Sequence, residues 1–357
     1  MNRLFFSLLV AFFLLTGCVK QQILERVTLF IVCAYDDAPN DQIEFTLAAP
    51  KFQAGKPGSV SDILLSKVGH TSMNILELMS MRLNRPINSG RVSVILFGKD
   101  LAAKGLTKEL EAGLRDAQSS RRKYLAIVDG KAKEMLQANF SSDEEKGMFL
   151  LNLLDTNVRT GLVPRQNFHE FEYSYLGKGM DPFLPLLKLQ NDQVQISGLA
   201  LFKDDKYVMS LNEKQMRLMK LLLENVKHGT LEVKLDDAYV AMEIVGSKVH
   251  YLVRKDTESP KVTINLIVNG QIIDSMGVHF PEQEKQRIKD RFESDLTATG
   301  MDLIQLFKNE GIDPLGLGDF VRSKTRNWNE EEWKKQYRTL NVSLNVKVNL
   351  TEMGIRK

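Results

Sequence analysis

Cysteine is nearly absent from this chain, which has two cysteines, Cys18 and Cys33, among 357 residues. If Cys18 is modified, Cys33 has no partner, so a disulfide framework of the kind that stabilises small secreted domains is excluded. Cys33 lies in the apolar run 29–35, which is typical of a buried strand. We therefore interpret Cys33 as a small apolar core residue.

Signatures of catalysis are also missing. The sequence has no Gly-x-Ser-x-Gly motif, no Walker loop and no dinucleotide-binding fingerprint. The five histidines are far apart and include no pair four residues apart; they are His70, His169, His228, His250 and His279. We expect no metal, no cofactor and no enzymatic activity.

Charge of one sign and long apolar runs are both scarce. The net charge is +3 and the basic residues are scattered, so we expect no nucleic-acid partner. The apolar run Phe5–Leu15 is shorter than the roughly 20 residues that a membrane-crossing helix needs. It follows Arg3 and is typical of the apolar core of a secretory signal peptide.

The small residues Thr16 and Gly17 follow this apolar run directly before Cys18, and the order Leu15-Thr16-Gly17-Cys18 resembles a bacterial lipobox. In that pattern residues 1–17 are removed, and Cys18 carries an S-diacylglyceryl group and an N-acyl chain. Two acyl chains give stable membrane anchoring where one would be marginal. The alternatives are an ordinary signal peptide with an incidental cysteine, or an uncleaved anchor.

The remaining chain has the composition of a globular protein, with 43% hydrophobic and 26% charged residues. Its length of about 340 residues exceeds what one core usually holds. We predict an elongated α+β protein of two to three domains, in which mixed and antiparallel sheets pack against helices. The predicted divisions are an N-terminal domain over 18–192 and a C-terminal domain over 196–357, with a further split near 230.

Hydrophobic periodicity predicts the individual elements. The clearest strand is 341–350, which alternates polar and apolar residues for its whole length. Other strands are predicted at 27–35, 42–49, 91–97, 124–128, 194–202, 207–211, 231–235, 239–244, 249–254 and 261–268. Helices are predicted to begin at Ser61, at Thr107, at Asn212 with a stop at Gly229, and at Pro281 with a stop at Gly311. We expect Trp328 and Trp333 to contribute to core packing, although an exposed partner surface is the alternative.

Several segments occur together in a characteristic order. The lipobox cysteine is followed by Gly98–Leu106 leading to Leu114-Arg115, then by Gly198–Asp205, by Ile312–Gly318 after the long helix, and by the alternating final strand. In this order and spacing, and over essentially the whole chain, the sequence resembles the Ger(x)C family, the lipoprotein C subunits of spore germinant receptors.

This resemblance implies a lipid-anchored protein on the outer face of the spore inner membrane, with a three-domain α+β fold. The family works with a polytopic A subunit and a transporter-like B subunit, in a complex that senses small nutrients and triggers ion and dipicolinate release. Its members are not known as enzymes. The segment containing Asp313, Pro314, Gly316 and Gly318 is interpreted as a turn that ends a helix, with a partner-contact loop as the alternative.

Two other functions compete with this one. A solute-binding lipoprotein of a transporter would need two lobes of repeated βαβ units, and the C-terminal half is too rich in consecutive strands for that arrangement. A lipid-anchored hydrolase would need a nucleophile and base that the sequence does not reveal.

Overall fold

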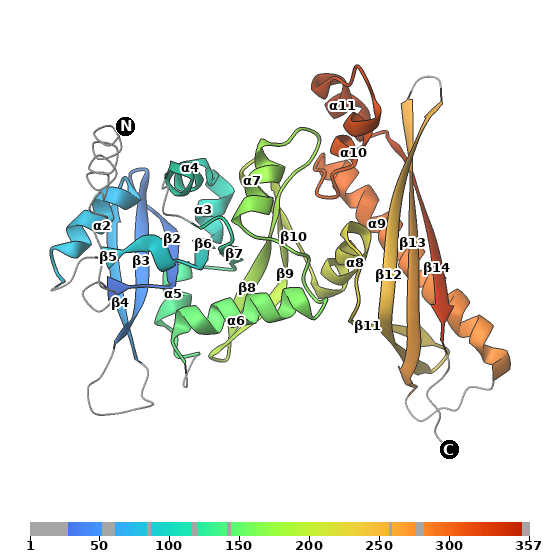
Figure 1. Ribbon diagram of the computed structural model, residues 1–357, viewed down its shortest axis with the longest axis horizontal. Helices are drawn as coiled ribbons and strands as arrows, with labels where there is room; N and C mark the ends of the chain where they lie inside the picture. The colour runs from blue at the N-terminus through green and yellow to red at the C-terminus, as the bar shows by residue number, and fades with distance from the viewer. Residues whose placement is uncertain are drawn as a thin grey trace, which may run out of the picture.

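The computed structural model describes residues 28–51, 61–83, 87–115, 120–140, 144–256, 259–275 and 282–351. The predicted signal peptide and Cys18 lie outside these residues. The described part is elongated, with an eight-stranded sheet and its helices toward one end and a four-stranded sheet at the other (Figure 1). Helices and sheets are mixed throughout, which confirms the α+β prediction.

The large sheet has the strand order β10-β9-β8-β7-β6-β2-β3-β4. Its middle strands β2, β6, β7 and β8 run parallel, and antiparallel hairpins extend it on both sides. The bounds are β2 (Val32–Ala38), β3 (Gln42–Lys51), β4 (Ser61–Gly69), β6 (Val94–Gly98), β7 (Tyr124–Val128), β8 (Phe183–Gln190), β9 (Gln193–Lys203) and β10 (Lys206–Leu211). The parallel strands β6 and β7 are almost entirely apolar because both faces of the sheet are covered.

Two cores lie on the two faces of this sheet, and β2 shows the alternation directly. Cys33 and Tyr35 join one core, whereas Val32 and Ala34 join the other. Burial raises the pKa of Cys33 to about 12, and the thiol is a free core residue, in line with our interpretation of it. The covering helices are α2 (Ser72–Ser80), α3 (Lys99–Lys104), α4 (Thr107–Arg115), α5 (Ala132–Gln137), α6 (Lys146–Arg159) and α7 (Phe168–Leu176). A separate parallel pair joins β1 (Thr28–Leu29) to β5 (Ile87–Asn88), which the 3-10 turn η2 (Ser89–Arg91) follows.

The prediction that a helix begins at Ser61 is wrong, because this segment is the edge strand β4. Leu64 packs against the core on one face of the sheet and Leu65 against the core on the other. Apolar residues on both faces imitate a helical spacing. The helix itself begins at Ser72, where the Thr71 hydroxyl accepts a hydrogen bond from the Asn74 N–H.

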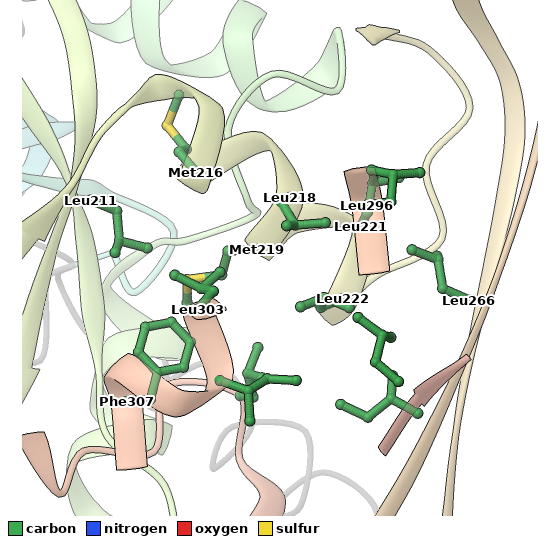
Figure 2. Packing of buried hydrophobic residues seen from close by; sticks show 14 of the residues in the cluster. Leu211, Met216, Leu218, Met219, Leu221, Leu222, Leu266, Leu296, Leu303 and Phe307 are labelled. Carbon is green, nitrogen blue, oxygen red and sulfur yellow. The ribbon is translucent and has the colours of Figure 1, made fainter. Parts of the chain in front are cut away.

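Helix α8 (Glu213–Leu223) begins as predicted, with Asn212 and Gln215 forming a reciprocal capping box. It ends at Leu223 rather than at Gly229, which adopts a positive φ of 142° in the turn before β11. Its buried face joins the large C-terminal core, where Met219 and Leu222 lie near Leu303 and Phe307 of the long helix (Figure 2). The predicted stop was placed too late because a glycine also suits a turn outside a helix.

The four-stranded sheet has the order β11-β12-β13-β14. Its strands are β11 (Thr230–Leu235), β12 (Ala238–Asp256), β13 (Ser259–Asp274) and β14 (Asn341–Leu350). The helices of this part of the chain are α9 (Lys285–Glu310), which the 3-10 turn η3 (Glu282–Glu284) precedes, α10 (Leu317–Lys324) and α11 (Glu330–Tyr337). The sequence predicts two strands where β12 is one, because an irregularity between Ile244 and Gly246 interrupts its alternation. Strand β14 and the stop of α9 at Gly311 agree with prediction.

The predicted boundary between domains falls between β8 and β9. These two strands pair as an antiparallel hairpin in the eight-stranded sheet, so this sheet contains residues from both sides of the boundary. The domain division stays a prediction.

Candidate functional site

The segment 312–318 connects α9 to α10 and contains the four residues of the candidate partner-contact loop. Gly311 and Gly316 both have left-handed backbone, with φ of 68° and 66°. Glycine adopts this conformation without the steric cost that a Cβ would bring. The segment is therefore a turn that ends one helix and starts the next.

Asp313 holds this turn from inside. Its side chain is only 4% exposed. One carboxylate oxygen accepts the Leu317 N–H at 3.0 Å and the other accepts the Gly318 N–H at 2.7 Å. Because these are unpaired donors at the start of α10, Asp313 satisfies the helix N-terminus. Burial raises the pKa of Asp313 to about 7, although these hydrogen bonds act in the opposite direction.

A second aspartate, Asp181, ties the turn to the beginning of β8. Its carboxylate accepts the Asp313 N–H at 2.7 Å and the Asp204 N–H at 3.1 Å. In return, the Asp181 N–H donates to the Asp313 carbonyl at 2.9 Å. Burial raises the pKa of the Asp181 carboxyl. These bonds connect the eight-stranded sheet to the helices that pack against the four-stranded sheet.

Two glycines meet at the same junction. The Gly179 carbonyl accepts the Asp319 N–H at 2.9 Å. A Cβ built on Gly318 would lie 2.7 Å from the Gly179 Cα and 2.3 Å from Nε1 of Trp333. Trp333 is buried and contacts the partly buried Trp328, with ring centroids 6.5 Å apart, which confirms core packing for this pair. Close backbone approach requires glycine at both positions.

A pocket of about 560 Å³ opens beside this turn. Its walls come from α7, the end of α8, β12 and α10. The polar side chains that line it include Arg165, Glu170, Glu224 and Asp319. Pro314 and Gly316 line the pocket, whereas Asp313 and Gly318 are buried behind it. Of the four predicted contact residues, two therefore face a cavity and two hold the turn in shape.

Sequence reasoning did not identify Gly179, Asp181 or Tyr337. The Tyr337 hydroxyl donates to the Ile312 carbonyl at 2.7 Å, and so fixes the other end of the turn. The Gly179-Met180-Asp181-Pro182 stretch is a recognisable turn signal, but nothing local reveals that its partner lies 132 residues away. Buried Lys220 was also missed; its ammonium donates to the Val163 carbonyl at 2.7 Å and to Glu224 at 3.0 Å.

The arrangement is suited to binding and to holding two halves together. Across the described residues, no group of three or more histidine, cysteine, aspartate or glutamate side chains is placed to hold a metal ion. None of the helices in the described ranges is long and apolar enough to span a bilayer. Cys18 lies outside those ranges, so its lipidation stays a prediction.

Comparisons with known proteins agree across the chain. A family model described as "Spore germination protein N-terminal domain" matches residues 20–189, and one described as "Spore germination B3/ GerAC like, C-terminal" matches residues 197–354. The chain is 27% identical over 361 residues to "Spore germination protein GerQC" of Bacillus cereus, covering 99% of both chains. It is 19% identical to "Putative spore germination protein YfkR" of Bacillus subtilis, covering 96% of this chain and 94% of that one.

A solved structure has the same fold. The "Crystal Structure of the GerBC protein" superposes with a TM-score of 0.59 and 17% identity, covering 90% of this chain and 97% of that chain. The superposition covers most of both chains, so the overall fold is shared.

Proposed function

The chain belongs to the Ger(x)C family of spore germination proteins, and from this premise we propose that it is the lipid-anchored C subunit of a nutrient germinant receptor. The observation that carries the proposal is the match to two spore germination family models in their proper order, over 20–189 and 197–354. The alignment with the Bacillus cereus relative from end to end supports it.

In this function the protein has no catalytic step to perform. It acts with the polytopic A subunit and the transporter-like B subunit, and the three are required together for a nutrient to trigger germination. The buried Asp181–Asp313 junction supports a rigid body of fixed length, with the pocket beside Pro314 and Gly316 as a surface for a partner. Because a rigid scaffold does not have to become ordered when a partner binds, binding loses less conformational entropy.

Attachment to the membrane is through Cys18. The S-diacylglyceryl group and the N-acyl chain on this residue would hold the protein at the outer face of the spore inner membrane. Residues 19–27 separate the lipid from the first described strand, so the folded part lies close to the bilayer.

The test is a deletion of the gene in a spore-forming host, complemented with the wild-type chain or with Cys18→Ala. Deleted spores should lose release of dipicolinate in response to at least one nutrient, and wild-type complementation should restore it. With Cys18→Ala, the protein should leave the membrane fraction and the nutrient response should fall. If deletion leaves every nutrient response intact while nutrient uptake falls, the chain is instead a solute-binding lipoprotein.

A further inference from the structure

Helix α2 carries an exposed apolar surface that no other described element covers. Met73 is 67% exposed and Met81 is 74% exposed, which makes them the most exposed large apolar side chains of the described residues. The inward face of α2 packs against the sheet, where Ile75 and Met79 are buried. Its outward side therefore presents two methionines to solvent beside the exposed polar residues Asn74 and Glu77, and the exposed methionines carry a free-energy cost that polar side chains would not.

A shallow pocket extends this surface toward the first strand. It has a volume of about 430 Å³ and is lined by Met73, Asn74, Leu76, Glu77, Ser80 and Ile87. Ile87 lies in β5 and pairs with Thr28 of β1. Thr28 is the first residue that the structure describes. The apolar surface thus adjoins the point at which the chain from the N-terminus joins the fold.

The length of that chain limits the position of the fold relative to the membrane. Cys18 precedes Thr28 by ten residues. Ten residues reach at most roughly 35 Å when fully extended. Lipidation of Cys18 would therefore keep β1 within this distance of the bilayer, on the same side of the molecule as α2, whereas the four-stranded sheet lies at the opposite end of the long axis (Figure 1).

Two exposed basic residues lie close in the sequence to residues of this surface. Arg82 follows Met81 directly, and Arg91 ends the turn that follows β5; both are exposed. Glu77 is the acidic residue of the pocket. Exposed methionines beside exposed arginines match the interfacial region of a bilayer, where apolar side chains enter the acyl boundary and cations meet headgroups.

We propose that Met73 on the outward face of α2 and Met81 directly after its last residue, with Arg82 beside them, dock on the membrane surface and hold the long axis of the molecule pointing away from it. This inference rests on the proposed anchoring through Cys18. A lipid attached ten residues before β1 would not by itself set the orientation of the fold. A second contact on α2 restricts it, and so places the junction pocket at a set height above the bilayer.

The test uses the lipidated full chain in vesicles of phosphatidylcholine and phosphatidylglycerol, with a single cysteine introduced by Met73→Cys. Lipid occupies Cys18 and burial protects Cys33, so an environment-sensitive fluorophore attaches to the new thiol. Leu252→Cys is the matched control, because Leu252 is an apolar residue 52% exposed on β12 at the opposite end of the molecule. Nitroxide groups on the lipid acyl chains then report insertion.

We expect the fluorophore at position 73 to shift to the blue and to lose most of its emission to the lipid quencher, with no such change at position 252. In the Met81→Glu background the quenching at position 73 should fall. If the protein floats with the vesicles but positions 73 and 252 are quenched equally, the docking is wrong and the anchor stands. If the Cys18→Ala chain without vesicles shows the same blue shift, another part of this chain or a second copy covers α2, which also overturns the proposal. Failure to float would refute the anchoring itself.

Discussion

The contact between Gly318 and Gly179 makes a sharp prediction for Gly318→Ala. The added Cβ would lie 2.3 Å from Nε1 of Trp333 and 2.7 Å from both Cα and O of Gly179. The indole could shift, but the Gly179 backbone is held by its hydrogen bond from the Asp319 N–H at 2.9 Å. The two halves of the junction must therefore separate.

The expected loss of stability combines the cost of overpacking with the cost of a lost hydrogen bond. Overpacking a tight site costs about 1–3 kcal/mol and a lost hydrogen bond about 1 kcal/mol, so the expected loss is about 2–4 kcal/mol. A chain of about 340 residues loses roughly 1.4 °C of melting temperature per kcal/mol, so the melting temperature should fall by about 3–6 °C. Gly246→Ala is the matched control, because no atom lies within 4 Å of the position that its added Cβ would occupy and its φ is not left-handed.

Thermal unfolding of the purified Cys18→Ala chain, followed by circular dichroism, measures the difference. The Gly246→Ala chain should melt close to the wild-type temperature. A Gly318→Ala chain that melts with it would show that the backbone contact between the two halves is loose, and the junction could then not be rigid.

Three further predictions concern buried polar groups. The pKa of Asp313 is raised from 3.8 to about 7, so the folded state favours the protonated carboxyl more than the unfolded state does. The free energy of unfolding should therefore fall as the pH rises from about 4 through 7, by up to roughly 4 kcal/mol. Asp313→Asn should flatten this part of the stability profile, and a profile that this variant leaves unchanged between about pH 5 and about pH 8 would contradict it. Cys33, buried and with a pKa raised to about 12, should resist a thiol reagent at neutral pH until guanidinium unfolds the chain; complete labelling of the native protein would refute its placement. Lys220→Met removes the buried ammonium that donates to the Val163 carbonyl and to Glu224, and it should lower the free energy of unfolding by about 2–3 kcal/mol. Lys214→Met is the control, because Lys214 is exposed and pairs with Asp295 at the surface; it should lower the free energy of unfolding by less than about 1 kcal/mol. Equal losses in these two variants would show that the buried lysine contributes no more than a surface one.

The elements with strong local signals were predictable from the sequence. The final strand alternates without interruption, and the capping box of Asn212 with Gln215 fixes the start of α8. At Ser61 the local signal was misleading, because an edge strand with apolar residues on both faces imitates helical spacing. The register of a strand depends on which cores cover it, and this information is not local.

The candidate site was predictable only in part. The turn at 312–318 follows from its proline and glycines. Its partners Gly179 and Asp181 belong to a segment far away in the sequence, and their role arises from tertiary packing alone. Whether a buried aspartate caps a helix or binds a ligand cannot be read from its identity, because both uses need the same carboxylate.

The central claim is that this chain functions as the C subunit of a germinant receptor, and its partners test it most directly. An affinity-tagged wild-type chain would be cross-linked in intact spore inner membranes and isolated, with the Cys18→Ala chain as control. We expect a polytopic A subunit and a transporter-like B subunit to be recovered with the wild type and depleted with Cys18→Ala. Recovery of the permease and ATPase of a solute importer in their place would contradict the claim.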